Sequence, residues 1–158
     1  MALKKWMDIY GTRNGPRMSR QLKVIADADS IIAQAVFNDN HHKKAIQISE
    51  FLISTNAQVI YPATAIIEAI TYMQRVLNSS NSAYATAIVF TDPDIKVEEV
   101  NQKILSRAIS YFSPTISKKN TMFDCIVASI AEGYSADAIF SFDKFYKKCG
   151  FKLASEMI

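Results

Sequence analysis

The chain has 158 residues, 49% of them hydrophobic, which is enough for one sizeable core and too few for two comfortable domains. Its 18 Lys and Arg against 15 Asp and Glu give a net charge of +3, an excess that permits nucleic-acid binding without requiring it. No stretch approaches the roughly 20 apolar residues of a membrane span, and the N-terminus lacks the apolar segment of a signal peptide, so we expect a cytoplasmic protein.

Residues 1–20 differ from the rest of the chain. Glycine, proline and asparagine punctuate them, and no hydrophobic periodicity persists. We predict that residues 1–20 form an arm or leader outside the core, and that residues 21–158 form a single domain.

After the leader, segments typical of buried strands alternate with segments of helical periodicity. In chain order, the predicted elements are a strand at 22–25, helices at 30–37 and 41–55, a strand at 58–61, helices at 62–77 and 82–90, a short strand at 95–97, helices at 100–112 and 122–134, a strand at 138–142, a short helix at 143–148 and a final strand at 151–153. This alternation predicts an α/β fold with a mostly parallel sheet of about four or five strands, covered by helices on both faces.

Four acidic residues are predicted to lie at one edge of this sheet. Asp27 and Asp143 end two of the strands, while Glu68 and Asp124 lie in early turns of helices that begin at the same edge. Taken singly, each acid has an ordinary explanation, since Asp is common in turns and favourable near the positive end of a helix. The apolar neighbours of Asp124 and Glu68 weaken that explanation for these two residues.

Carboxylates that converge repel one another unless they are protonated or bridged by cations. Oxygen ligands without a partner His or Cys favour Mg²⁺ or Mn²⁺, which also accept phosphate oxygens as ligands. The chemistry that this arrangement suggests is phosphodiester hydrolysis. His41 and His42 point to different faces of their helix because they are adjacent, so we predict that they are surface residues and not joint ligands.

The segments VIADADSII, ATAIIEAI, FDCIVASIA and ADAIFSFDKFYKKCGFKL resemble the PIN-domain ribonucleases. The resemblance covers residues 22–153 and implies a PIN-like three-layer α/β/α sandwich. It assigns catalytic and metal-binding roles to four acids, Asp27, Glu68, Asp124 and Asp143. It also implies that Asp29 and Thr64 are supporting polar groups, although a neutral Asn or Ser is commoner in the family at the position of Asp29.

The compact size is similar to the VapC-type toxins of toxin–antitoxin pairs. That similarity implies an RNA substrate, a small antitoxin as partner and a homodimer. Lysines contact phosphates without reading sequence, and three of them, Lys118, Lys119 and Lys144, are predicted to attract the RNA backbone near the same edge of the sheet.

Two alternatives remain open from the sequence. One is a non-catalytic PIN-like module that binds RNA or protein. The other is a haloacid dehalogenase-like phosphatase, because Asp27 and Asp29 form a DxD pair after the first strand. That pattern expects Thr or Val in place of Ile31 and a paired-acid motif near the end of the chain, which is not found.

Overall fold

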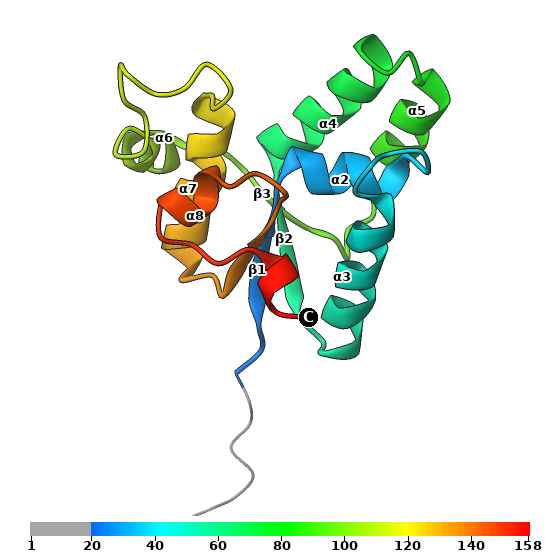
Figure 1. Ribbon diagram of the computed structural model, residues 1–158, viewed down its shortest axis with the longest axis horizontal. Coiled ribbons are helices and arrows are strands. Elements are labelled where there is room, and N and C mark those ends of the chain that lie inside the picture. The colour runs from blue at the N-terminus through cyan, green and yellow to red at the C-terminus, as the bar shows by residue number, and fades with distance from the viewer. Residues whose placement is uncertain (1–19) are drawn as a thin grey trace, which may run out of the picture.

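A parallel β-sheet forms the centre of the fold (Figure 1). The computed structural model describes residues 20–158, and within them the sheet has four strands in the order β3-β2-β1-β4, with every neighbouring pair parallel. The strands are β1 (Lys23–Ala26), β2 (Gln58–Pro62), β3 (Lys96–Glu98) and β4 (Ala138–Phe140). The predicted α/β class with a parallel sheet is confirmed.

Helices flank the sheet on both sides in Figure 1. One side of the picture holds α2 (Ala28–Ala35), α3 (His42–Ser54), α4 (Ala63–Arg75) and α5 (Ser80–Val89). The other side holds α6 (Gln102–Ala108), α7 (Met122–Tyr134) and α8 (Phe145–Lys148), and a 3-10 helix, η1 (Ala154–Glu156), follows near the C-terminus. The arrangement agrees with the predicted α/β/α sandwich. No helix within residues 20–158 is long and apolar enough to cross a membrane.

The central strands are buried on both faces, which explains their continuous apolar sequences. Successive side chains of a strand point to opposite faces, so Val24 of β1 joins the core beneath α3, while Ile25 joins the larger core around α7. Phe140 and Ile139 of β4 divide between the two cores in the same way. These strands therefore place the residues that follow them firmly with respect to the core.

One predicted strand is absent, and another ends earlier than predicted. Residues 151–153 do not form a strand: Leu153 makes only an isolated bridge to Ile139, and its amide donates to the side chain of Glu156 over 2.8 Å, which starts η1 instead of continuing the ladder. Strand β4 ends at Phe140 and not at Phe142, because Ser141 and Phe142 turn to hydrogen-bond an acid that follows β1. The helix predicted at 100–112 is shorter, because α6 ends at Ala108 and residues 109–111 form turns. The other predicted elements are present with shifts of one or two residues at their ends.

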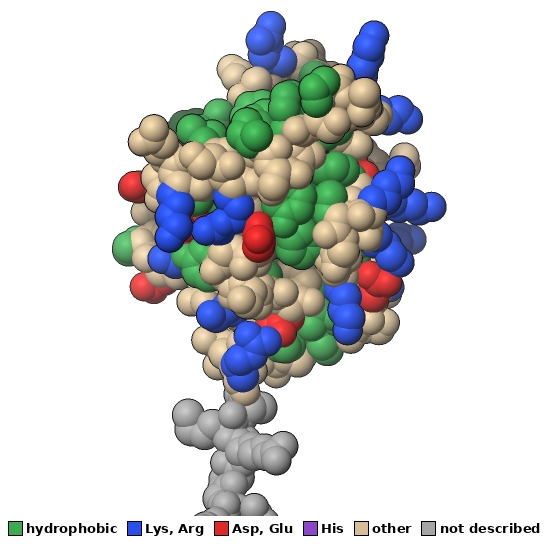
Figure 2. All heavy atoms as spheres, turned by 90° about the vertical axis from the view of Figure 1, so that its left-hand side faces the viewer, with side chains coloured by type: hydrophobic (Ala, Val, Ile, Leu, Met, Phe, Trp, Pro, Cys, Tyr) green, Lys and Arg blue, Asp and Glu red, His purple; other side chains and the backbone are tan. Residues whose placement is uncertain are grey.

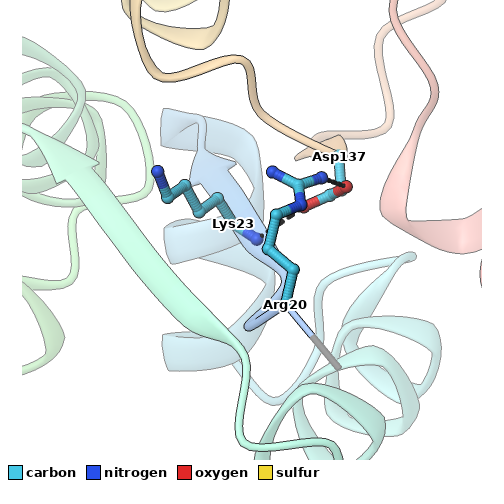
Figure 3. A network of polar contacts seen from close by, with 3 residues as sticks. All are labelled: Arg20, Lys23 and Asp137. Atoms are coloured by element: carbon cyan, nitrogen blue, oxygen red, sulfur yellow. Dashed lines mark hydrogen bonds and ion pairs between the residues drawn. The ribbon is translucent and has the colours of Figure 1, made fainter. Parts of the chain in front are cut away.

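The first described residues are attached to the sheet. The guanidinium of Arg20 pairs with Asp137, and the Lys23 amide donates to the other oxygen of that carboxylate over 2.8 Å (Figure 3). Arg20 therefore contacts the domain, whereas the rest of the predicted arm, residues 1–19, lies outside the described residues. On the side of the molecule formed by α6, α7 and α8, Lys and Arg side chains are scattered among hydrophobic and other side chains and do not form one continuous patch (Figure 2).

Candidate metal centre

One open pocket, of about 280 Å³, collects the four predicted acids. Asp27 follows β1, Asp143 comes soon after β4, and Glu68 and Asp124 come from α4 and α7. The chain runs outward from β1 to β2 and β3 and then returns to place β4 on the other side of β1, so β1 and β4 flank a topological switch point. Ligands of open α/β sheets bind outside the carboxyl ends of the strands at such a point. The pocket is also lined by Ala28, Asp29, Ile32, Asp39, His41 and Tyr72.

Asp27 is the deepest of the four acids, with only 5% of its surface exposed. It caps the N-terminus of α2, where its carboxylate accepts a hydrogen bond from the Ala28 amide over 2.7 Å. Its other oxygen accepts from the hydroxyls of Tyr146, over 2.8 Å, and Ser141, over 3.1 Å. The Ala28 amide and the Tyr146 hydroxyl therefore orient the buried carboxylate, while the single proton of the Ser141 hydroxyl is shared between Asp27 and Asp29.

Asp29 supports the turn that follows β4. Its Oδ2 accepts hydrogen bonds from the Phe142 amide over 2.8 Å and from the Ser141 hydroxyl over 2.9 Å. Its Oδ1 is buried without a hydrogen-bond partner within the described residues. A buried carboxylate oxygen that lacks a donor, beside a pocket lined by acids, is a feature that a bound cation or its water would satisfy.

Asp124 has both an ordinary structural role and a place in the pocket. It forms a capping box with Thr121 at the start of α7, accepting from the Thr121 amide over 2.5 Å. Its other oxygen lies 3.5 Å from the Tyr146 hydroxyl, the same hydroxyl that donates to Asp27. Tyr146 is fully buried and thereby connects the two acids from beneath the pocket.

Glu68 and Asp143 lie at more open positions of the pocket, since both side chains are only partly buried. Asp143 accepts from the Phe145 amide over 2.8 Å and from the Asn120 side-chain amide over 3.1 Å. Glu68 projects from the second turn of α4 toward the charges of Asp27 and Asp124.

Burial and mutual repulsion raise the pKa values of these acids. Burial, followed by the charges of Asp27 and Asp124, raises the pKa of Glu68 to about 7. Burial is also the main cause that raises the pKa of Asp27, with Asp29 adding to it, and burial raises the pKa of Asp29 and of Asp124. Carboxylates whose negative charges oppose one another favour a cation among them.

The donor set fits a hard divalent cation. All the candidate ligands are carboxylate oxygens, which suit Mg²⁺ or Mn²⁺. As the side chains stand, however, no three His, Cys, Asp or Glu residues within the described part of the chain are positioned to hold a metal ion together. Asp124 and Asp143 instead accept hydrogen bonds from nearby amides. Metal binding would therefore need side-chain rotations that bring these carboxylates together.

Four other predicted site residues do not line this pocket. Lys118 and Lys119 are exposed in the segment between α6 and α7, and Lys144 is exposed next to Asp143; none of the three lines the pocket. Thr64 does not line it either, although its hydroxyl oxygen is buried and has no hydrogen-bond partner within residues 20–158.

The sequence did not point to three residues that contribute to the site. Ser141 and Tyr146 hold Asp27, and both lie in the segment AIFSFDKFY that contains Asp143, which was the available signal. His41 is exposed, as predicted for a surface residue, but it also lines the pocket and stacks on Phe142, with ring centroids 4.2 Å apart. His42 instead bonds the Ala33 carbonyl oxygen over 2.7 Å.

The raised pKa values predict a pH dependence of stability. Between about pH 4 and pH 7, the folded protein retains protons that carboxylates of an unfolded chain release. The free energy of unfolding without metal should therefore fall as pH rises through this range and change little above it. Metal binding needs deprotonated carboxylates, so Mn²⁺ should raise the melting temperature more at about pH 8 than at about pH 5.5.

Melting curves with and without Mn²⁺ at both pH values check this expectation. The Glu68→Gln variant is the control, because it lacks one of the titrating groups and should show a shallower fall without metal. A metal-induced shift of equal size at the two pH values would contradict the prediction.

Comparison with known proteins gives structural matches only. No family model matches the sequence, and no curated protein matches it. The fold is similar to VapC20 of Mycobacterium tuberculosis, a Sarcin-Ricin loop cleaving toxin, with a TM-score of 0.67 and 16% identity over 81% of this chain and 95% of that chain. It is also similar to FitAcB from Neisseria gonorrhoeae, with a TM-score of 0.60 and 12% identity over 82% of this chain and 95% of that chain. The chain therefore has a VapC-like PIN fold.

Proposed function

We propose that the protein is a metal-dependent endoribonuclease that hydrolyses phosphodiester bonds of RNA. The observation that carries this proposal is the convergence of Asp27, Glu68, Asp124 and Asp143, from four separate elements, on one open pocket at the switch point of the sheet. The VapC-like PIN fold supports it, since VapC20 is itself a Sarcin-Ricin loop cleaving toxin. By the same analogy, we propose a toxin of a toxin–antitoxin pair, with a small antitoxin as partner and a homodimer as the assembly.

The four acids would hold one or more Mg²⁺ or Mn²⁺ ions at this pocket. When bound, such an ion supplies a Lewis acid that activates water and stabilises charge on the phosphate and leaving oxygens. The protein itself would supply the oriented ligands. The hydroxyls of Tyr146 and Ser141 hold Asp27 in its orientation. Asp29 keeps the turn after β4 against the pocket through the Phe142 amide, and this turn positions Asp143.

Positive charge near the pocket would attract the RNA backbone. Lys144 follows Asp143 directly, and Lys118 and Lys119 lie in the segment that leads to α7. Because the basic side chains on this side of the molecule are scattered (Figure 2), they would provide general attraction to phosphates and no reading of sequence. Target choice would then come from the shape of the RNA and from contacts with its bases.

The phosphatase alternative has less support from the site. A phosphatase of that type expects a paired-acid motif near the end of the chain, which the sequence lacks, and Oδ2 of Asp29 already accepts from the Ser141 hydroxyl and the Phe142 amide, which leaves only Oδ1 open. Burying several acids side by side costs free energy, and the raised pKa values of Asp27 and Glu68 reflect that cost. A non-catalytic module would give these acids no function that offsets it.

A cleavage assay with labelled single-stranded RNA separates the three functions. We expect internal cleavage with Mn²⁺ or Mg²⁺ and none with a chelator, restored when metal is added back. Cleavage that persists in chelator would reject the metal, and RNA binding without cleavage would favour the non-catalytic module. Hydrolysis of small phosphoesters with intact RNA would favour the phosphatase.

A further inference from the structure

A second groove opens directly beside the acidic pocket. It has a volume of about 490 Å³ and lies between α4 and the start of α7. Its lining consists of Ile67, Glu68, Thr71, Tyr72, Arg75, Val76 and Phe123. Glu68 and Tyr72 also line the acidic pocket, so the two hollows lie side by side and share part of their walls.

The groove exposes apolar and aromatic surface that the core does not use. Ile67 and Val76 are 63% and 62% exposed, and the two rings, Tyr72 and Phe123, are 42% and 43% exposed. Neither ring packs against another aromatic ring within residues 20–158. Large exposed apolar side chains gathered at one hollow mark a binding surface more often than scattered ones do.

Each of the two rings lies close in sequence to one of the acids. Tyr72 follows Glu68 by four residues on α4, so both project from one face of the helix. Phe123 directly precedes Asp124 in the first turn of α7. Each ring is thus held close to a carboxylate at which we place the reaction.

Arg75 adds positive charge to the same groove. It lies three residues after Tyr72, on the same side of α4, and forms no ion pair within the described part of the chain. An exposed guanidinium next to exposed rings can contact a phosphate while a neighbouring base stacks on the rings. Aromatic rings combined with a nearby cation are the common features of single-stranded nucleic-acid sites.

We propose that this groove binds one unpaired RNA base adjacent to the cleaved phosphodiester. Tyr72 and Phe123 provide the stacking surface, and Arg75 contacts the phosphate on the outer side of that base. The subsite rests on the proposed ribonuclease function for the identity of its ligand. A base fits better than an apolar partner helix or a second copy of the chain, because the groove contains a cation and adjoins the acidic pocket, with which it shares Glu68 and Tyr72.

Binding of fluorescein-labelled single-stranded RNA, measured by anisotropy with a chelator present, tests the subsite without cleavage. Tyr72→Leu and Phe123→Leu keep apolar bulk but remove the ring, and each should weaken binding about tenfold. Replacing one nucleotide of the RNA by an abasic residue should weaken binding to the parent protein by a similar factor. At that position the Leu variants should lose nothing further, because the same contact is already absent.

The controls separate stacking from charge and from folding. Tyr84→Leu removes a ring that is 71% exposed on α5, outside the groove, and should bind RNA like the parent. Arg75→Gln should lower the dependence of log affinity on log salt by about one, while the Leu variants should leave that slope unchanged. Melting curves establish that each variant is folded.

Several results would overturn the subsite. They are equal affinity of the parent for intact RNA and for every abasic RNA, Leu variants that bind like the parent, or a parent that binds no RNA. Leu variants that keep RNA affinity but sediment as a smaller species would identify the groove as a contact between two copies. A parent that shows the abasic effect but never cleaves RNA with metal would reject the endoribonuclease and retain the subsite.

Discussion

The Asp124→Asn protein is expected to lose RNA cleavage by about 100-fold or more in the presence of Mn²⁺. Losing a group that only positions a ligand costs roughly 10- to 100-fold, and loss of a ligand itself should exceed that range. The neutral amide removes a charged oxygen from the pocket, although it has nearly the same shape. Single-turnover cleavage of labelled RNA, with metal and enzyme both in excess, measures the effect.

Stability distinguishes this role from a structural one. The Asn side chain can still accept a hydrogen bond from the Thr121 amide, so the capping of α7 is largely retained. Removing the charge relieves repulsion with Asp143 and with other acids of the pocket. We therefore expect the free energy of unfolding without metal to be no lower than in the parent, while Mn²⁺ raises the melting temperature less than it does in the parent.

Asp94→Asn is the matched control. Asp94 is exposed, makes no ion pair within residues 20–158 and does not line the pocket. Its variant should cleave RNA and respond to Mn²⁺ like the parent. If Asp124→Asn instead unfolds readily without metal, or cleaves normally, Asp124 serves only to cap α7.

The positions of the acids could be predicted because the parallel topology determines them. Residues that follow β1 and β4 must emerge at one edge of the sheet, and α4 and α7 begin near that edge. The alternation of Val24 and Ile25 between two cores shows why β1 was recognisable as a buried strand. The same rules therefore predicted both the fold and the convergence of Asp27, Glu68, Asp124 and Asp143 on one pocket.

The contacts that orient those acids could not be predicted, because they depend on how irregular segments turn. Ser141 and Tyr146 reach Asp27 across sequence separations of 114 and 119 residues, after the chain has left β4. The stacking of His41 on Phe142 depends on the same turn. The apparent strand at 151–153 fails for a related reason, since the side chain of Glu156 captures the amide that would extend it. Side-chain to backbone bonds of this kind leave no hydrophobic period in the sequence.

Tyr146→Phe tests whether the connection beneath the pocket matters for function. The variant keeps the buried ring but removes the hydroxyl that donates to Asp27 and lies near Asp124. A hydrogen bond to a charged group contributes about 2 kcal/mol, so the melting temperature without metal should fall by roughly 4–8 °C near neutral pH. The loss should shrink at about pH 4, where Asp27 of the folded chain is protonated and the Tyr146 hydroxyl no longer donates to a charged group.

The effect on cleavage has a distinct pH signature. The Tyr146 hydroxyl lowers the pKa of Asp27, which burial raises, so its removal should raise that pKa further and weaken metal binding near neutral pH. Cleavage should fall about 10- to 100-fold at about pH 7 and recover partly at higher pH. Tyr111→Phe is the control, because Tyr111 donates to Glu132 over 3.1 Å outside the pocket, and its loss should leave the pH profile unchanged. A Tyr146→Phe protein that is less stable but keeps the parent's pH profile would show that the hydroxyl supports only the core, and that Asp27 keeps its metal affinity without it.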